Sequence, residues 1–558
     1  LKINWIKQKK KNFYPKGRNI DENAIIEVRN LINKLPIRRD LLIEYLHLIQ
    51  DKHKQIRKKY LGALSHILKI PFAEAYEVAS FYAHFDVIED DAPSLQDITI
   101  RVCDSITCEM FGSERLISDL SNGLDNSKVR VLRAPCMGLC DKAPACEVGH
   151  RHVTKASLDS VKTVIESKDL HPQKVPGKSI EEYISDGGYE ILQKCYKGEM
   201  DVDKVIEEIN LSGLKGMGGA GFPSGQKWKF VRLEKSPRLM TINGDEGEPG
   251  TFKDKLYLEN NIHQFFEGML IAAWAVDAKD IYVYMRDEYP EIRIRMFEEL
   301  EIIKSKKLID SETNVHIRRG AGAYICGEES AMIESIEGKR GLPRHKPPFV
   351  SKVGLFGRPT LNHNIETVFW VPRILSKGHE WFNKQGKEGH KGPHSYSVSG
   401  RVKEPGVKLA PAGISMNELL NDYCGGMLDG HKFLGYLPGG ASGGILPAEM
   451  ADIPLDFGTL DKYGCFIGSG AVVVFSDKDD IKKVAINLLK FFNDESCGQC
   501  TPCRVGTEKA VKLMEKNVWN KDLMDDLVKT MSDASICGLG QAAGNPISCV
   551  LKYFKDKL

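Results

Sequence analysis

Seven of the fourteen cysteines stand in two groups with short internal spacings. In the first group, Cys103 and Cys108 form C-x4-C, and Cys136 and Cys140 form C-x3-C. Four thiolates brought together from two such pairs are enough to ligate a 2Fe-2S cluster. A structural zinc site and a redox dithiol are the alternatives, although zinc prefers C-x2-C pairs and a thioredoxin-like dithiol needs C-x-x-C, which this region lacks.

The second group lies near the carboxyl end and consists of Cys497, Cys500 and Cys503 in C-x2-C-x2-C. Three thiolates at this spacing can hold one face of a 4Fe-4S cube, which then needs one remote ligand. We predict Cys537 for that position. Cys549 is the alternative, but it lies in an apolar helical run, where a buried thiol is the commoner explanation.

Two glycine-rich stretches could cradle a ligand. Residues 214–228 contain five glycines, which expose backbone N–H groups, and Lys227 adds a charge suited to phosphate. Residues 243–254 crowd carboxylates into a loop that glycine and proline keep from becoming a helix. Either could be a surface loop, but together they offer phosphate donors beside acceptors for ribose, ring-nitrogen or amide groups. Neither has the Walker or the G-x-G-x-x-G pattern.

A third loop, residues 320–330, leads into a helical run at 331–337. It places the ring of Tyr324 and two carboxylates, Glu328 and Glu329, at a helix start. A helix N-terminus favours a ligand phosphate, but these carboxylates would repel one and are better suited to hydroxyl or amide groups.

Strands and helices must bring these groups together. Strand-like residues 98–102 and 129–132 each deliver one of the first cysteine pairs. Strand-like residues 281–284 and 315–317 alternate with helical runs such as 263–276, which indicates an α/β layer. Residues 20–89 and the last region are helical in pattern, and residues 395–475 are short strands broken by proline and glycine, in which we expect no chemistry.

The composition bounds the possible functions. A chain of 558 residues with 42% hydrophobic and 28% charged residues fits a soluble protein of three or more domains. The net charge of +2 argues against binding to nucleic acid or to a membrane surface. No apolar run reaches the length that spans a bilayer, and no signal-peptide pattern opens the sequence. Many cysteines in a chain of cytosolic character indicate metal or redox chemistry, so we expect a cytoplasmic protein.

These motifs together carry a resemblance to known proteins. Residues up to about 170 resemble the thioredoxin-like 2Fe-2S subunit of respiratory complex I, and those from about 190 resemble its flavin- and NADH-binding subunit. The fusion of the two, together with the sequence segments 39–44, 80–86 and 399–407, is most similar to the β subunit of molybdenum- or tungsten-dependent, NAD-linked formate dehydrogenases. The diaphorase subunit of NAD-reducing hydrogenases is the nearest rival.

The resemblance implies an α/β multidomain fold. Its expected parts are an N-terminal helical region (1–92), a thioredoxin-like 2Fe-2S domain (93–170), a linker (171–190), a Rossmann-like α/β domain for FMN and NAD (191–394), a β-grasp-like domain (395–475) and a helical 4Fe-4S domain (476–558).

The resemblance also implies binding residues. For FMN they are Gly216, Gly218, Gly219, Lys227, Asn243, Asp245, Glu246, Tyr324, Gly327, Glu328 and Asn364. For the nicotinamide nucleotide they are the rings of Phe222, Phe230 and Phe349, with Glu248 and Glu329 as polar contacts. This chain has Met217 where the family usually has arginine, and His363-Asn364 where it has two asparagines.

The implied function is NAD reduction by an FMN and iron–sulfur diaphorase subunit. Formate would be oxidised on a large molybdenum- or tungsten-containing partner, and electrons would pass along clusters to FMN and leave as hydride on NAD⁺. Because the cofactor supplies the hydride chemistry, no side chain is expected to act as general acid or base. A hydrogenase diaphorase and a non-catalytic zinc-binding scaffold are the alternatives.

Overall fold

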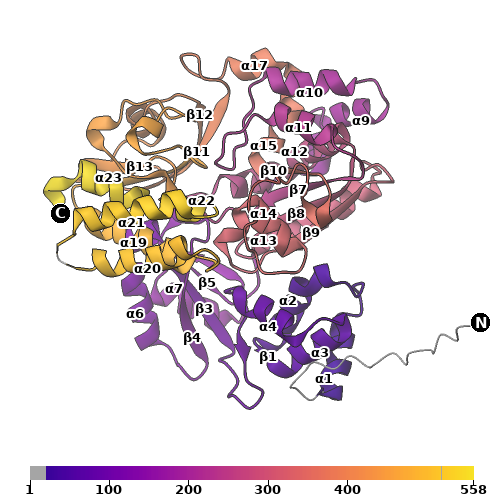
Figure 1. Ribbon diagram of the computed structural model, residues 1–558, viewed down its shortest axis with the longest axis horizontal. Coiled ribbons are helices and arrows are strands. Elements are labelled where there is room, and N and C mark those ends of the chain that lie inside the picture. Colours follow the sequence, from indigo (N-terminus) through magenta and orange to yellow (C-terminus); the bar gives the residue numbers. More distant parts are fainter. Residues whose placement is uncertain (1–19, 517) are drawn as a thin grey trace, which may run out of the picture. The chain divides into compact units, whose positions relative to one another are not determined.

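The computed structural model describes residues 20–516 and 518–558, which form two compact units. The first unit comprises the chain up to Leu95 together with Ser335–Arg340, and the second comprises Gln96–Glu334 and Gly341–Leu558. Their elements are labelled in Figure 1. Within the described ranges, every helix is too short or too polar to cross a lipid bilayer.

The first unit is mainly helical, as its sequence pattern predicts. Its helices are α1 (Glu22–Leu31), α2 (Leu42–His53), α3 (Lys58–Leu68) and α4 (Phe72–Phe81), and β1 (Ile56–Arg57) pairs in parallel with β2 (Val87–Ile88). Leu42, Leu46, Leu61 and Leu64 are fully buried on the helix faces that the spacing marks as apolar.

A four-stranded sheet opens the second unit, in the order β4-β3-β5-β6. Its strands are β3 (Ile98–Cys103), β4 (Val129–Ala134), β5 (Ala145–Val148) and β6 (Arg151–Thr154), with helices α5 (Ile106–Met110), α6 (Ser113–Gly123) and α7 (Leu158–Ser167). Because β3 and β4 run in parallel, with Cys103 opposite Ala134, their carboxyl ends bring both cysteine pairs to one edge.

The second sheet is wholly parallel, in the order β10-β7-β8-β9. Its strands are β7 (Arg238–Gly244), β8 (Ala278–Met285), β9 (Asn314–Arg319) and β10 (Thr360–Asn364). Its helices are α8 (Ile180–Ser185), α9 (Glu190–Tyr196), α10 (Val202–Leu211), α11 (Ser224–Arg232), α12 (Lys253–Val276), α13 (Pro290–Ser305), α14 (Glu329–Ile336), α15 (Ile365–Phe369), α16 (Val371–Lys377) and α17 (His379–Asn383). The predicted α/β layer is therefore confirmed.

Two local features differ from the sequence interpretation. The expected linker, 171–190, contains α8, which Ser179 and Glu182 cap reciprocally at its N-terminus. The glycine-rich stretch contains the start of α11, so Lys227 and Trp228 lie on a helix and not in a loop. Pro223 precedes this helix, where its fixed φ suits a helix start.

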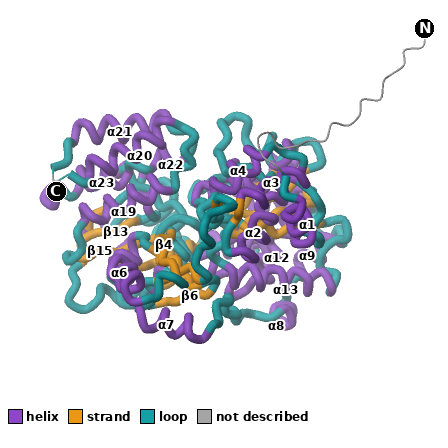
Figure 2. Tube along the Cα trace, turned by 90° about the horizontal axis from the view of Figure 1, so that it is seen from below, coloured by secondary structure: helices purple, strands orange, loops and turns teal. Residues whose placement is uncertain are grey.

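A five-stranded sheet and a group of helices complete the chain. The sheet order is β12-β11-β15-β13-β14, from β11 (Pro393–Gly400), β12 (Gly406–Pro411), β13 (Phe433–Leu437), β14 (Leu446–Pro447) and β15 (Ala471–Ser476). The helices are α19 (Ile481–Asp494), α20 (Thr501–Met514), α21 (Lys521–Ala534), α22 (Gly538–Ala542) and α23 (Asn545–Tyr553). These helices pack side by side, as Figure 2 shows.

Candidate functional site

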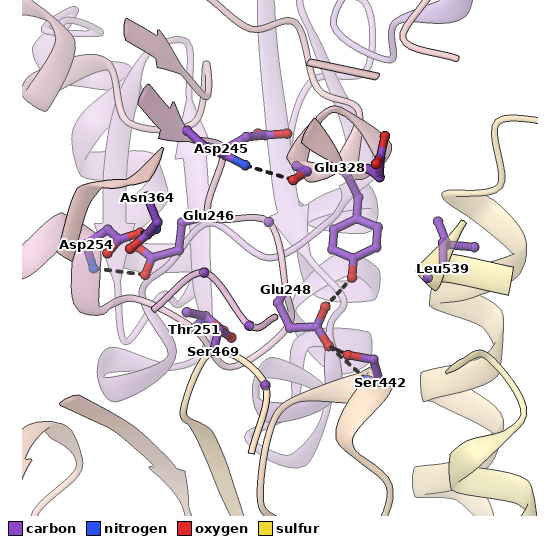
Figure 3. Close-up of a pocket in the computed structure, with 18 of the residues that line it drawn as sticks. Asp245, Glu246, Glu248, Thr251, Asp254, Glu328, Asn364, Ser442, Ser469 and Leu539 are labelled. Carbon is purple, nitrogen blue, oxygen red and sulfur yellow. Dashed lines mark hydrogen bonds between the residues drawn. The ribbon is translucent and has the colours of Figure 1, made fainter. Parts of the chain in front are cut away.

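A cavity of about 270 Å³ lies where the parallel strands β7 and β10 end. Nine of the eleven residues expected to hold FMN line it, together with Glu248 from the expected nucleotide contacts (Figure 3). The nine are Gly218, Gly219, Asn243, Asp245, Glu246, Tyr324, Gly327, Glu328 and Asn364. The carboxyl ends of parallel strands are the usual ligand site of such sheets, because the loops that follow them converge there.

Hydrogen bonds fix the shape of the acidic loop that follows β7. Asn243 donates from Nδ2 to the Gly327 carbonyl at 2.8 Å and accepts the Asp245 N–H at 3.0 Å. Glu246 accepts the backbone N–H groups of Asp254 and Lys255 at 2.9 and 3.2 Å, which caps the start of α12. The loop is therefore held by its own side chains before any ligand binds.

Several of these carboxyl groups are shielded from water. Burial raises the pKa of Glu246 to about 8, and the nearby charge of Asp254 adds to the effect. Burial also raises the pKa of Asp245 well above its usual range. Among the described residues, the Asp245 Oδ2 atom is buried and has no hydrogen-bond partner. Such an atom at a cavity wall suits a polar group of a ligand.

A buried charge cluster borders the cavity. Lys253 Nζ contacts Asp254 Oδ1 at 2.8 Å and Glu366 Oε2 at 2.9 Å. Asn364 donates to the other oxygen of Asp254. Lys253 and Asp254 both line the cavity, although the sequence interpretation assigned a role to neither.

Glu248 joins three segments that are far apart in the sequence. Its Oε1 accepts the Ser442 N–H at 2.8 Å and the Ser442 hydroxyl at 2.7 Å, and its Oε2 accepts the Tyr324 hydroxyl (Figure 3). Ser442 belongs to the region in which the sequence indicated no chemistry. That prediction is wrong, because Ser442, Phe466, Gly468 and Ser469 from this region line the cavity. The only signal in the sequence was the glycine runs at 439–444 and 468–470.

Two residues expected to hold FMN do not line the cavity. Gly216 donates its N–H to the Phe222 carbonyl at 2.8 Å and so closes the glycine-rich loop. Lys227 Nζ lies 3.9 Å from Glu329 Oε2.

The two unusual residues of this chain, Met217 and His363, face the protein interior. The side chain of Met217 is buried in the core of the parallel sheet, and its N–H donates to Thr367. His363 accepts the Trp228 indole N–H at 2.6 Å. Neither side chain therefore takes the place of a ligand contact.

The aromatic residues expected to stack a nucleotide are exposed. Phe222, Phe230 and Phe349 are 43%, 51% and 56% exposed, and the rings of Phe222 and Phe230 lie 6.2 Å apart between centroids. Lys346 Nζ contacts Glu328 at 2.9 Å and Glu329 at 2.8 Å. Exposed aromatic faces can accept a flat ring by stacking.

The first four cysteines converge behind the acidic loop. All four are buried, the Cys136 and Cys140 sulfurs are 3.3 Å apart, and the Cys103 thiol is within hydrogen-bonding reach of Cys108 and Cys136. Phe252, at the end of the acidic loop, packs against Cys136 and Cys140. The Gly250 N–H faces both of these sulfurs.

The carboxyl-terminal cysteines lie on the other side of the cavity. Cys497 and Cys537 are close enough to interact electrostatically, as are Cys500 and Cys503. Gly538, Leu539 and Ala542 follow Cys537 on α22 and line the cavity. Cys549 instead lies against Cys465, with sulfurs 3.5 Å apart. Among the described residues, no group of three or more His, Cys, Asp or Glu side chains surrounds a point ready for a single metal ion.

Family models match three parts of the chain. Residues 209–373 match the Nuo51 FMN-binding domain, residues 28–169 a thioredoxin-like 2Fe-2S ferredoxin, and residues 483–558 the iron–sulfur binding region of NADH-ubiquinone oxidoreductase F. The NADH-quinone oxidoreductase F subunit numbered 2 in Rhizobium meliloti is 40% identical over 395 residues, which are 68% of this chain and 93% of that protein. The chain belongs to the family of NADH-quinone oxidoreductase F subunits.

Another F subunit and a solved structure extend the comparison. The NADH-quinone oxidoreductase F subunit of Aquifex aeolicus is 39% identical over 392 residues, covering 68% of this chain and 90% of that protein. A crystal structure of an NAD⁺-reducing NiFe-hydrogenase in the H2-reduced state superimposes with a TM-score of 0.82 at 29% identity, and covers 94% of this chain and 93% of that one. The mixed α/β fold expected from the sequence is thus confirmed.

The three family matches together give the cofactors. They are FMN, one 2Fe-2S cluster and one 4Fe-4S cluster, with NAD(H) as substrate. The cavity fits a flavin, because it combines the unpartnered Asp245 oxygen with glycines where any side chain would crowd the wall. A Cβ atom on Gly218 would lie 3.2 Å from Asn364, and one on Gly247 would lie 3.1 Å from Tyr324. The protein is therefore an NADH-dehydrogenase-like oxidoreductase subunit that transfers electrons to or from NAD.

Proposed function

We propose that the chain is the NAD-reducing subunit of a cytoplasmic formate dehydrogenase. Formate would be oxidised on a large molybdenum- or tungsten-containing subunit, and the electrons would reach this chain through its clusters and leave on NAD⁺. Reduced thiols and NAD⁺ are both available in the cytoplasm, which suits this chemistry.

The observation that supports electron exchange is the position of the cavity between two sets of thiols. The acidic loop borders the cavity and carries Gly250 and Phe252 against Cys136 and Cys140. On the opposite wall, α22 begins directly after Cys537. A flavin exchanges one electron with a cluster and two with NAD, so it belongs between them.

We assign the individual residues accordingly. The ligands of the 2Fe-2S cluster are Cys103, Cys108, Cys136 and Cys140. The ligands of the 4Fe-4S cluster are Cys497, Cys500, Cys503 and Cys537. FMN takes the nine expected residues that line the cavity, while Gly216 shapes the glycine-rich loop and Lys227 lies beside Glu329. The nucleotide stacks at Phe222, Phe230 and Phe349, beside Glu248 and Glu329. The six-part domain division follows the same assignment.

The electron donor separates the two versions of this function. The sequence segments that resemble formate dehydrogenases, 39–44, 80–86 and 399–407, support formate as the electron donor. The similarity to the solved NAD⁺-reducing hydrogenase over 94% of this chain favours dihydrogen as the second candidate. The residues that line the cavity do not distinguish formate from dihydrogen, because in both cases the donor reacts on another subunit.

Purification of the complex from its natural source tests the proposal. The affinity-tagged chain should bring down a large subunit that contains a pterin with molybdenum or tungsten, and the complex should reduce NAD⁺ with formate. Reduction of NAD⁺ by dihydrogen and not by formate, together with nickel in the partner, would instead establish the hydrogenase version.

A further inference from the structure

A short loop after β8, residues 286–289, reaches both the 2Fe-2S thiols and the flavin cavity. All four of its side chains are buried. The sequence interpretation assigned no role to this loop, and none of its residues lines the cavity.

Arg286 connects the two sites directly. Its guanidinium is only 3% exposed and donates from Nη2 to the Cys136 carbonyl and from Nη1 to the Glu246 carbonyl. One planar side chain thus holds the backbone of a thiol loop and the backbone of the cavity loop at the same time. Arginine is suited to this, because its donors are rigidly arranged and it keeps its charge at any physiological pH.

Tyr289, at the other end of this loop, also contacts both the cavity loop and the thiol loop. Its hydroxyl donates to Glu246 Oε2 at 3.0 Å, and its ring lies 5.0 Å from the Arg286 guanidinium. A Cβ atom on Gly138, which follows Cys136 by two residues, would lie 2.2 Å from the Tyr289 hydroxyl. The thiol loop therefore fits against Tyr289 only because position 138 is glycine, with φ of +65°.

Glu288 partly offsets the charge of Arg286. Its Oε2 lies 3.2 Å from Arg286 Nε, and both side chains are buried. The two charges act in opposite senses on the cavity wall, since Arg286 favours ionisation of Asp245 and Glu288 disfavours it. Little water screens these buried charges, so the charges that act on Asp245 at the cavity also act on the nearby cysteine thiols.

We propose that Arg286 is a positioning residue for the 2Fe-2S cluster, which fixes the Cys136 loop against the flavin cavity and raises the reduction potential of the cluster. Reduction adds an electron, so a nearby positive charge stabilises the reduced form and a nearby negative charge destabilises it. Arg286 and Glu288 therefore shift the potential in opposite directions. The inference rests on the proposed assignment of Cys136 as a cluster ligand.

Redox titration of the purified holo-chain, followed by the EPR signal of the 2Fe-2S cluster, tests this role. Arg286→Gln should lower the ratio of reduced to oxidised cluster at a given potential about tenfold, which is about 59 mV for a one-electron couple. Glu288→Gln should shift the potential upwards. Arg286→Lys keeps the charge and should restore most of the potential that the Gln variant loses.

Arg295 supplies a matched control. It is also buried and donates to backbone carbonyls, those of Lys178 at 3.1 Å and Pro176 at 3.3 Å. Arg295→Gln should therefore destabilise the fold and leave the 2Fe-2S potential unchanged. If Arg286→Gln and Glu288→Gln shift the potential in the same direction, or if Glu288→Gln shifts it no more than Arg295→Gln does, the proposal is wrong.

The ligand assignment is checked separately. Cys136→Ala should abolish the 2Fe-2S signal and lower the iron content, while the 4Fe-4S signal persists. A normal 2Fe-2S cluster in Cys136→Ala would overturn the assignment, and the inference about Arg286 with it. An absent cluster in Cys136→Ala combined with unshifted potentials in the Arg286 and Glu288 variants would overturn the inference alone.

Discussion

At the scale of single residues, the pKa values of the two carboxylates expected to meet NAD are shifted in opposite directions. Burial opposes ionisation of Glu329, but Lys227 and Lys346 outweigh it and keep the pKa of Glu329 below its usual value. Burial raises the pKa of Glu248, and hydrogen bonds from Ser442 and Tyr324 only partly oppose the shift. Glu329 is therefore the more reliably charged group at neutral pH.

Glu329→Gln should relax the discrimination against NADP⁺. Its negative charge would repel the extra phosphate, and its removal would leave Lys227 without this neighbouring carboxylate and able to attract that phosphate. We expect kcat/KM for NADP⁺ relative to NAD⁺ to rise about tenfold, which corresponds to about 1.4 kcal/mol. Steady-state kinetics with both nucleotides measure this ratio. Glu312→Gln, at an exposed glutamate paired with Lys279, is the control, and an equal ratio in the two variants would contradict the assignment.

His363 gives a prediction for acid stability. Burial holds the pKa of His363 well below its usual value, and the Lys227 charge adds to this. In the unfolded chain His363 binds a proton near pH 6.5, whereas in the folded chain it stays neutral. The free energy of unfolding therefore falls as the pH falls below 6.5, by about 1.4 kcal/mol per pH unit. His363→Asn should remove this contribution. The melting temperature followed by circular dichroism should fall less for the variant than for the wild type between pH 7.0 and 5.5, and equal losses would contradict the prediction.

At the scale of elements, the sequence predicted most of what local patterns determine. The strands that deliver Cys103 and Cys136 and the α/β alternation around β8 and β9 were visible because period-two and helical spacings depend only on neighbouring residues. Ser442 and Leu539 were not predicted, because they reach the cavity from separate parts of the chain. Long-range placement of this kind depends on packing between domains, and no local pattern records it.

The acidic loop borders the cavity and packs against Cys136 and Cys140, and the N–H of its Gly250 faces both sulfurs. Gly250 has φ of +92°, and a Cβ atom there would lie 2.9 Å from Val473. Gly250→Ala should displace the loop from Val473 and disturb its contact with Cys136 and Cys140, so we expect loss of 2Fe-2S cluster and of FMN. Iron, labile-sulfide and flavin analysis measure both losses.

Gly198→Ala is the control for backbone strain alone. Gly198 has φ of +72°, and a Cβ atom there would meet nothing within 4 Å. The change should cost about 1 kcal/mol of stability and leave the cofactors in place. A full cofactor complement in Gly250→Ala would show that the loop does not need this close approach.

At the scale of the whole second unit, three segments meet at one cavity. The parallel sheet supplies the acidic loop, the five-stranded sheet region supplies Ser442, and the carboxyl-terminal helices supply Leu539, two residues after Cys537. Glu495, two residues before Cys497, accepts the Tyr324 N–H at 2.9 Å and so ties the carboxyl-terminal thiols to the cavity wall. We therefore expect electron transfer between the cofactors only when the three segments are assembled together.

Anaerobic titration of the purified chain with NADH, followed by visible absorbance, tests this arrangement most directly. A flavin takes two electrons and each cluster takes one, so a connected chain should consume about two NADH per chain, and both the flavin and the iron–sulfur absorbance should fall. Consumption of one NADH per chain, with bleaching of the flavin alone, would contradict the placement of the flavin between the two clusters.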